Sequence, residues 1–552
     1  MRTGVLTLTP WRKSSGISEV WGAPHKGGPP LQTLQAAETG LDCMKDGRWS
    51  NQRYDIKYAP MPSHHSAIMT HSVEDVVIVG GGLSGVVTAI HLVRATKTPL
   101  KIAIIEPNAQ LGRGLAYRNP EVEHRLNGPG SRHAIYPESL SHFHDWYMEQ
   151  ALDKQDPEAC DASGYHFPRR YDFGSYLNAE MRKHMAQNAS GSKIAHITDR
   201  AIDVIKKNGL FEIALEGGGT ISARVVVVAA TPGKANVPAV LSTLAKTGTA
   251  FLPEPWDTER LRRIPKSADV LILGMAQTAS DVAASLLKYG HTGAITLLSR
   301  RGKRPRKRPP LDASSYTRAD VTDAEKHAQF MDPDGALKPA SRILGELRRE
   351  ARIAAAGGAS WVPVMEKLRD LITDHWNSLP LGEKMRFFRH ARTWYDVHRF
   401  RLPPQVEGRI EAAEGTGQVS FLSATILGVT PHGSRLDFHL RERGSLKAVN
   451  RSFDVAVNCT GLEDRLGQTN NPFLTALIAR GFAAQHATGS GFDVDICGNA
   501  IDTKGHANRS LFIVGPLTYG AFADQQGSIF IVRRVLRVLP EIIREVLIRR
   551  VS

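Results

Sequence analysis

Three glycines between Val76 and Gly85 give the clearest chemical signal in the sequence. The segment reads VVIVGGGLSG, so an apolar β-branched run leads into Gly80, Gly82 and Gly85 with G-x-G-x-x-G spacing. The first glycine allows a sharp turn out of a strand, the second removes a Cβ from the path of a pyrophosphate, and the third lets a helix pack closely. Free N–H groups at the start of that helix face the phosphates. The pattern predicts a bound dinucleotide.

A second strand and a terminal acid complete this unit. The helical pattern of residues 86–94 is followed by the apolar run 101–105 (KIAII), which ends at Glu106. A carboxylate at that strand end is placed to bind two ribose hydroxyls. Strand, glycine turn, helix, strand and acid therefore occur in the order of a βαβ nucleotide-binding unit. A glutamate here does not choose between FAD and NAD.

A second unit of the same kind begins at Asp269. The strand-like run 270–273 leads into a turn and then a helix that extends through Leu287. The turn reads GMAQTA, in which Gly274 and Thr278 are the candidate cofactor-binding residues. Alanines stand at the second and third glycine positions of the motif. The third position tolerates alanine, whereas a methyl group at the second lies where the backbone approaches a pyrophosphate.

Two arginines follow the second strand of this unit. The run 294–298 ends at Ser299, and Arg300 and Arg301 come next. Because an arginine in this place pairs with a 2′-phosphate, a nicotinamide cofactor bound here is predicted to be NADPH rather than NADH. Alternatively, both arginines begin a solvated basic loop, since residues 300–308 read RRGKRPRKR.

Length and composition indicate a globular protein of two to four domains in the reducing cytoplasm. The chain has 552 residues, of which 41% are hydrophobic. No apolar run reaches the roughly 20 residues of a membrane-spanning helix. The cysteines form no CxxC and no metal-ligand spacing, so we expect no disulfide framework, no dithiol relay and no metal. Cys459, in an NCTG turn, is expected to be a small buried thiol.

The net charge of +15 is spread along the chain and is densest at residues 300–308 and 529–550. Nucleic acid or an anionic membrane surface would suit such charge. We favour a solvated basic surface and no nucleic-acid partner, because no RNA-binding module or helix-turn-helix pattern accompanies the charge. Pro540 interrupts the partly amphipathic C-terminal stretch and argues against membrane binding.

Each glycine unit is followed by short strands and a second turn. The first such strand, 224–229, ends in AATPG, and the second, 453–457, ends in NCTG. This repeated order of elements predicts an α/β fold with two interleaved Rossmann-like dinucleotide-binding domains, each with a β-meander. Between the halves lies an inserted helical region with patterns at 341–355, 362–378 and 381–399. Insertions of this kind commonly cover an active site and select the substrate.

The motifs together resemble those of bacterial FAD/NAD(P)-binding proteins of the two-dinucleotide-binding-domain flavoprotein superfamily, related to the flavin N-hydroxylases and flavin-containing monooxygenases. The resemblance covers about residue 74 to the C-terminus. It rests on VVIVGGGLSG, GRGLAY, LNGPG, FPRRYDFGSYL, LILGMAQTASD, LLSRRG, FFRHARTWYDVHRFRLPP and NCTGLED. It implies an FAD-dependent oxidoreductase, reduced by NADPH, that acts as a monooxygenase or hydroxylase on a small molecule. The alternatives are a flavin oxidase or dehydrogenase without NADPH use, and a flavin-binding protein that docks to nucleic acid or a membrane.

The same resemblance implies roles for single residues. Glu106 would bind the adenosine ribose, Arg113 would run along the FAD, and Gly461 would close over the cofactor in the second T-G turn. Relatives often have Gly-Asp after the late strand 511–514, where this chain has Gly515 and a proline. Asp524 is the candidate replacement for that aspartate. The expected FAD-binding set is therefore Gly80, Gly82, Gly85, Glu106, Arg113, Gly461, Gly515 and Asp524.

The insertion supplies the candidates for substrate binding. Within FFRHARTWYDVHRFR, a helix would place His390, Trp394, His398 and Arg401 near one face, at i, i+4, i+8 and i+11. Such a face would bind an anionic or polar substrate beside the flavin. In the alternative interpretation these are packing and surface residues, with Trp394 in a core. His390 and His398 are two turns apart, too far for a simple two-histidine metal site.

These patterns divide the chain into five segments. Residues 1–72 lack sustained periodicity and are expected to be a disordered extension, or to result from a start codon placed before Met69. The expected order is then the first part of an FAD-binding domain at 73–235, a second NADPH-type unit at 236–309, a helical substrate region at 310–410, and a return to the second unit and the FAD domain at 411–552. The pattern specifies neither the substrate nor the oligomeric state.

Overall fold

The computed structural model describes residues 73–231, 233–247, 250–308, 330–332, 338–463, 465–523 and 526–551. The expectations for residues 1–72 and for Asp524 fall outside these ranges. In the described part of the chain, no helix has both the length and the apolar character needed to cross a bilayer. Within the same ranges, no three His, Cys, Asp or Glu side chains gather where they could hold a metal ion.

The first sheet is built around the strand that leads into the first glycine turn. β1 (Glu74–Val79) lies between β2 (Lys101–Ile105) and β6 (Thr220–Val228) and is parallel to both. The strand order is β14-β15-β6-β1-β2-β3, and the hairpin of β4 and β5 is attached to β6. The apolar run of β1 is buried because both faces of the sheet are covered. The remaining strands are β3 (Lys193–Ile197), β4 (Ala201–Lys207), β5 (Leu210–Leu215), β14 (Asn499–Ile501) and β15 (Ala507–Ile513).

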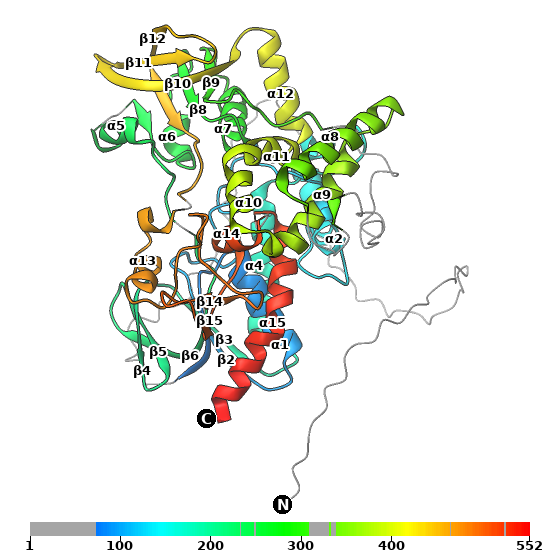
Figure 1. The fold of residues 1–552 in the computed structure, drawn as a ribbon, viewed down its shortest axis with the longest axis vertical. Helices are drawn as coiled ribbons and strands as arrows, with labels where there is room; N and C mark the ends of the chain where they lie inside the picture. Colours follow the sequence, from blue (N-terminus) through cyan, green and yellow to red (C-terminus); the bar gives the residue numbers. More distant parts are fainter. Residues whose placement is uncertain are drawn as a thin grey trace, which may run out of the picture. The chain divides into compact units, whose positions relative to one another are not determined.

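Two helices from opposite ends of the described chain cover one face of this sheet. α1 (Leu83–Ala95) and α15 (Ser528–Val551) share a buried core, in which Val86 and Ile90 pack with Val535 and Val538. Figure 1 shows them side by side, α1 in blue and α15 in red. α4 (Arg170–Ala186) joins the same core, and α13 (Pro472–Ala479) covers the other face of the sheet. Short helices α2 (His142–Glu149), α3 (Leu152–Gln155) and α14 (Tyr519–Phe522) complete this half.

The prediction that Pro540 interrupts the C-terminal segment is wrong, since α15 continues through it to Val551. A proline inside a helix removes one hydrogen bond and costs about 3 kcal/mol or more. The buried side chains on both sides of the proline, Val538 and Leu539 before it and Ile542 and Val546 after it, offset this cost by packing into the core. Tertiary packing therefore decides the length of this helix.

The second sheet is formed by the middle of the chain, in the order β12-β11-β10-β9-β8-β13-β7. β8 (Val270–Leu273) is parallel to β9 (Ile295–Ser299) and to β13 (Val455–Asn458). The single predicted strand 453–457 is divided between β12 (Ala448–Phe453) and β13. α7 (Gln277–Lys288) and α12 (Pro404–Gly415) pack on this sheet. The remaining elements are β7 (Phe251–Leu252), β10 (Val419–His432), β11 (Arg435–Glu442), α5 (Ser242–Thr247) and α6 (Thr258–Arg262).

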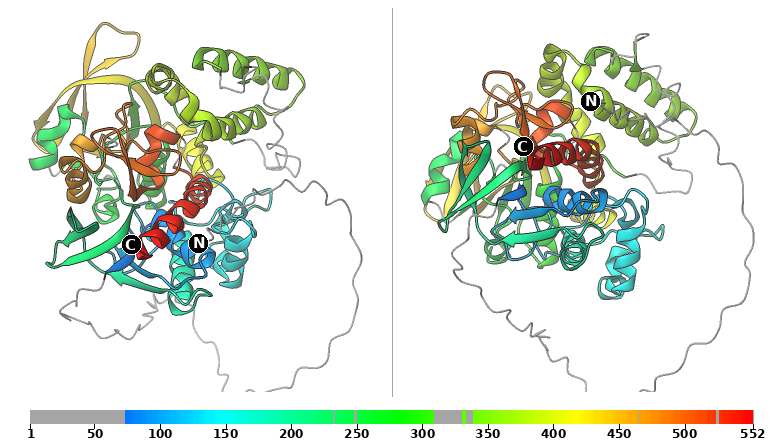
Figure 2. Two further views of the ribbon diagram at one scale, coloured as in Figure 1. Left: turned by 60° about the horizontal axis from the view of Figure 1, so that its bottom comes forward. Right: turned by 90° about the horizontal axis from the view of Figure 1, so that it is seen from below.

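The insertion forms a layer of helices with a core of its own. It comprises α8 (Ala340–Ala356), α9 (Val362–His375), α10 (Leu381–Arg386) and α11 (Arg392–Arg399). Figure 2 shows these yellow-green helices grouped on one side, apart from both sheets. The predicted helix 381–399 is present, but residues Phe387–Ala391 form a π-helical turn within it. Such turns are frequent at functional sites.

Candidate cofactor and substrate site

The first glycine turn accepts no side chain at two of its three motif positions. Gly80 has φ +108°, and a Cβ there would lie 2.6 Å from the carbonyl oxygen of Ala229 at the end of β6. A Cβ on Gly85 would lie 1.9 Å from the carbonyl oxygen of Gly80. Gly82 faces Gly114, and a Cβ on Gly82 would lie 3.4 Å from the Gly114 Cα. α1 therefore begins directly at a bare backbone turn, which is the geometry that a pyrophosphate requires.

Two side chains named from the sequence surround this turn. Glu106 follows β2, and its carboxylate accepts hydrogen bonds from the backbone N–H groups of Gly81 (2.9 Å) and Asn108 (3.0 Å). Arg113 donates through Nη2 to Ser175 Oγ (2.7 Å) and stacks on the Tyr171 ring at 3.8 Å. The glycine turn itself thus orients the carboxylate at the strand end.

Arg113 has a property that fits an anionic cofactor. Its Nε is buried and has no hydrogen-bond partner among the described residues. Burial lowers the pKa of this guanidinium, because it removes solvation from the positive charge. A phosphate next to it would supply both the missing acceptor and a compensating charge. The bare turn, Glu106 and Arg113 together fit the pyrophosphate and ribose of FAD.

The late strand β15 brings a third segment to the same place. Gly515 follows this strand with φ +76°, and a Cβ on it would lie 2.3 Å from Ser84 Oγ in the first turn of α1. Ser84 lies in the same turn as Gly82 and Gly85, more than four hundred residues earlier in the chain. Parallel pairing of β15 with β6 produces this approach. Gly515 therefore lies beside the first glycine turn.

The second glycine turn repeats the geometry of the first. Gly274 has φ +132°, and a Cβ there would lie 2.4 Å from the carbonyl oxygen of Cys459, as one on Gly80 would meet Ala229. Ala276 is exposed at the start of α7, and Thr278 is half-buried in its first turn. Gly461 is exposed with φ +104°, just beyond β13.

Cys459 contributes to this turn through its backbone. Its side chain is buried, and burial raises the pKa of the thiol well above its ordinary value. A thiol in that state is a poor nucleophile. The expectation of a small buried thiol at this position therefore agrees with its environment.

A basic cavity opens where β9 ends. It has a volume of about 420 Å³ and is lined by the expected pair Arg300 and Arg301 together with Lys303. The hairpin of β11 and β12 contributes Arg441 and Arg443, and the insertion contributes His390 and Trp394. Glu442 is the one acidic residue among the described lining residues. The cavity is thus built to take an anion.

The arginines of this cavity differ in how they are held. The Arg301 guanidinium donates to Thr393 Oγ1 (2.6 Å) and to the carbonyl oxygen of Arg389 (2.9 Å), both in the insertion. Arg300 is exposed, and no hydrogen bond or ion pair of its side chain occurs among the described residues. Lys303 Nζ lies 4.2 Å from the centre of the Trp394 ring.

Two later residues of the basic run form ion pairs within the fold. Arg304 Nη1 lies 2.7 Å from Glu414, and Lys307 Nζ lies 2.9 Å from Glu411, both on α12. The six arginines of the C-terminal segment include Arg544, paired with Glu541 at 2.5 Å. The first residues of the run therefore line a cavity, and Arg304 and Lys307 form surface ion pairs; pairing of Arg300 and Arg301 with a 2′-phosphate stays a prediction.

The four substrate candidates do not form a single face. α11 ends at Arg399, so Arg401 lies beyond the helix, where it pairs with Glu366 (2.6 Å). The prediction that Arg401 continues the face is wrong, because the chain leaves the helix before it. His390 and Trp394 line the basic cavity. His398 packs edge-on against Trp361 at 5.1 Å, and burial lowers its pKa.

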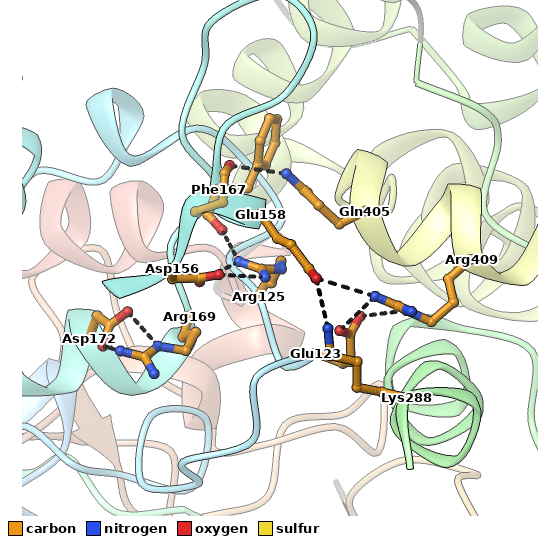
Figure 3. Close-up of polar contacts among 11 residues, drawn as sticks. Glu123, Arg125, Asp156, Glu158, Phe167, Arg169, Asp172, Lys288, Gln405 and Arg409 are labelled. Carbon is orange, nitrogen blue, oxygen red and sulfur yellow. Dashed lines mark hydrogen bonds and ion pairs between the residues drawn. The ribbon is translucent and has the colours of Figure 1, made fainter. Parts of the chain in front are cut away.

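Ion pairs join the two nucleotide units beside these sites (Figure 3). Arg409 of α12 reaches the buried Glu123, with Nη2 3.2 Å from the carboxylate. Glu158 accepts from Lys288 of α7 at 2.8 Å and lies 3.4 Å from Arg409. Arg125 and Asp156 form a buried pair with contacts of 2.7 and 3.0 Å that holds the loop carrying Glu158. These contacts hold the second unit against the first.

A further ion pair connects the two units at α7. Arg170 Nη1 at the start of α4 lies 2.7 Å from Asp281 Oδ2. Burial raises the pKa of Asp281 to about 6, although Arg170 acts in the opposite direction. The Asp281 carboxyl lies one turn beyond Thr278, so this contact fixes the N-terminal half of α7, which carries the second glycine turn.

Sequence reasoning missed Arg441 and Arg443, which complete the basic cavity. Neither residue stands near a motif, and the hairpin that carries them lies about 140 residues after Arg301 in the chain. The pairing of β10 with β9 brings the hairpin there. The sequence around Arg441 and Arg443 does not indicate this long-range strand pairing.

Comparisons with known proteins agree with this geometry. Residues 77–233 match a family model described as FAD-NAD(P)-binding. Residues 162–341 match one described as L-lysine 6-monooxygenase/L-ornithine 5-monooxygenase. A dual trans-enoyl reductase/FAD-dependent monooxygenase of Aspergillus terreus is 23% identical over 221 residues. That match covers 38% of this chain and 30% of the curated relative's length.

Solved structures of an ornithine hydroxylase and an L-lysine 6-monooxygenase share the fold. The ornithine hydroxylase of Pseudomonas aeruginosa superimposes with a TM-score of 0.56 at 14% identity, over 86% of this chain and 100% of that one. The L-lysine 6-monooxygenase of Pseudomonas syringae gives 0.57 at 15% identity, over 86% and 99%. The predicted fold class and the predicted superfamily resemblance are confirmed.

Proposed function

Because the chain is an FAD/NAD(P)-binding flavoprotein related to the ornithine and lysine N-hydroxylases and the flavin monooxygenases, we propose that it is an NADPH-reduced, FAD-dependent monooxygenase of small molecules. One observation carries the proposal. A single chain holds two turns that begin with a glycine in the same constrained position, Gly80 and Gly274, and a cavity lined by five Lys and Arg side chains opens after the second unit's second strand.

The first turn is assigned to FAD. Gly80, Gly82 and Gly85 leave the backbone bare for the pyrophosphate, and Glu106 is oriented for the ribose of the adenosine. The buried Nε of Arg113, which has no hydrogen-bond partner among the described residues, would donate to a phosphate oxygen. Gly515 and Gly461, each just beyond a strand end, would enclose the cofactor. FAD, when bound, supplies hydride acceptance and the chemistry with molecular oxygen.

The second turn and the basic cavity are assigned to NADPH. Gly274 and Thr278 would lie along the pyrophosphate, and Arg300 and Arg301 would pair with the 2′-phosphate. His390 and Trp394 share the cavity with Arg301, which favours contact with this end of the nicotinamide cofactor rather than with the substrate. Trp394 offers a ring face for stacking on a base.

N-hydroxylation of a primary amine is the reaction that we favour within this class. The family model for lysine and ornithine monooxygenases covers residues 162–341, which include the second glycine turn and the two strands on either side of it, β8 and β9. The inserted helices, within the expected segment 310–410, would cover the substrate beside the flavin. The residues of this chain then position the amine and exclude water, while the cofactor performs the oxidation.

A spectroscopic titration tests the proposal. Purified protein should show a flavin absorbance band at about 450 nm that bleaches within seconds when NADPH is added without oxygen. Readmitted oxygen should be consumed faster when ornithine, lysine or cadaverine is present, and the N-hydroxylated form of that amine should accumulate. A flavin that stays oxidised with NADPH would contradict the proposal and favour an oxidase reduced directly by its substrate. The methyl group of Ala276 is the one feature that supports this alternative.

A further inference from the structure

The helical insertion contains an apolar cavity that neither cofactor assignment uses. Its volume is about 650 Å³, within the range of roughly 300–1,000 Å³ that is usual for small-molecule sites. Its walls come from α8, α9, residues 376–379, the π-helical turn and α11. The apolar lining includes Leu344, Leu347, Met365, Trp376, Phe387 and Tyr395.

One wall of this cavity is α8, and the described residues cover its apolar side chains only in part. α8 has 17 residues, and among them only Ile343 is buried. Leu344, Leu347 and Ala351 are half-buried and line the cavity. Apolar side chains that border an open cavity favour an occupant that removes them from water. The other walls are concave and aromatic, which suits a small molecule.

Positively charged side chains also line this cavity, and no described residue places a carboxylate on it. Arg306, Arg348 and Arg352 line it, and its described lining residues include no Asp or Glu. Arg352 Nε donates to the carbonyl oxygen of Arg348 (3.2 Å), and neither guanidinium has a carboxylate partner among the described residues.

A neighbouring arginine on the same helix shows the contrast. Arg349 does not line the cavity, and it contacts Glu346 at 2.8 Å and Glu350 at 3.0 Å. Arg348 and Arg352 therefore line the cavity without a carboxylate partner among the described residues, whereas Arg349 is paired and lies outside it.

We propose that this cavity binds an amphiphilic anion, a molecule with an apolar chain and a carboxylate or sulfonate head. The chain would lie among the leucines and aromatic rings, and the head would meet Arg348 and Arg352. The site goes beyond the oxygenation reaction, because its occupation depends on neither NADPH nor oxygen.

The position of the cavity connects its occupant to the rest of the protein. Trp376 lines it and donates through Nε1 to the carbonyl oxygen of Gly520 in α14 (2.9 Å), just after the strand end at Gly515. Trp394 lines both this cavity and the basic cavity. Tryptophan fluorescence therefore reports directly on occupation.

Titration of the FAD-loaded full chain with dodecanoate tests the proposal. We expect saturable binding below the micellar concentration, followed by tryptophan fluorescence and calorimetry. The double variant Arg348→Ala/Arg352→Ala should bind dodecanoate about tenfold more weakly, and its affinity for uncharged dodecanol should not change. The matched control is Arg342→Ala/Arg349→Ala, which removes the same charge from the same helix outside the cavity and should bind dodecanoate like the parent.

Two results would overturn the proposal. One is the absence of saturable dodecanoate binding, and the other is an equal loss of affinity in both double variants. The variant Ala351→Trp adds an independent check, because it fills the cavity from α8. It should weaken binding of both dodecanoate and dodecanol while the FAD content stays at the parent level. Unchanged binding in this variant would place the ligand elsewhere and refute the site.

Discussion

Removing the Arg300 side chain should weaken NADPH binding without affecting NADH. Arg300 is exposed on the basic cavity and has no partner among the described residues, so its loss disturbs no internal contact. A hydrogen bond to a charged group contributes about 1.5–3 kcal/mol. Solvent screening at an exposed site reduces this to about 0.2–1 kcal/mol. The dissociation constant for NADPH should therefore rise roughly 1.4- to 5-fold.

The assay is anaerobic flavin reduction followed by stopped-flow absorbance over a range of cofactor concentrations. It yields a dissociation constant for NADPH and for NADH in the same protein. Arg304→Ala is the matched control, because Arg304 belongs to the same basic run but pairs with Glu414 and does not line the cavity. It should change neither constant.

The double variant Arg300→Ala/Arg301→Ala should lose more NADPH affinity than Arg300→Ala alone. It also removes the contacts of Arg301 with Thr393 and the Arg389 carbonyl oxygen, so some rise for NADH is expected as well. A parallel rise for both cofactors in Arg300→Ala alone, or no rise for either, would refute the assignment of the 2′-phosphate to this cavity.

Three further outcomes are expected. Gly82→Asp should abolish FAD binding, since a carboxylate would meet the pyrophosphate; a full flavin complement in the purified variant would disprove the site. Burial acts to raise the pKa of Glu366, but Arg369 and Arg401 outweigh it and lower the pKa from 4.5 to about 2. Glu366→Gln should therefore lower the free energy of unfolding at pH 7 by about 3 kcal/mol, as measured by urea unfolding. A carboxyl group whose pKa is lower in the folded state stabilises the fold at pH values above its unfolded-state pKa. This stabilisation should be lost as the pH falls from 4.5 to 2. An equal loss of unfolding free energy in the variant at pH 7 and at pH 2 would contradict the reasoning. Arg409→Ala leaves the buried Glu123 unpaired, so it should lower the free energy of unfolding by about 2 kcal/mol and slow flavin reduction by NADPH. The control Arg263→Ala breaks an exposed ion pair and should change neither quantity.

The parts of the site that lie within one βαβ unit were predictable from the sequence. Gly80 and Gly274 take left-handed backbone conformations that favour glycine, so residue type alone specifies the turn. Glu106 also lies where its strand predicts, because the strand end and the turn are joined by a single helix. At these positions the residue type itself indicates the local backbone geometry.

Contacts between distant segments were not predictable in the same way. Arg441 reaches the basic cavity only because β10 pairs with β9, and Glu123 meets Arg409 only because the two units pack together. The failure at Pro540 has the same origin, since core packing of α15 outweighs a local helix-breaking signal. The early exit of the chain before Arg401 shows that a helical face cannot be extrapolated past an unrecognised helix end.

The second nucleotide unit combines one unfavourable local feature with one favourable long-range feature, and their relative size decides its function. Ala276 adds a methyl group near the expected pyrophosphate, but it is exposed at the start of α7 and the turn around Gly274 keeps the geometry of the first unit. Arg300, Arg301 and Arg443 place three guanidinium groups on one cavity, where each hydrogen bond to a phosphate contributes about 1.5–3 kcal/mol before screening. A methyl contact that the cofactor can avoid by a small shift costs less than this gain. Affinity for the nicotinamide cofactor should therefore reside at its 2′-phosphate end, which makes discrimination against NADH a direct consequence of these arginines.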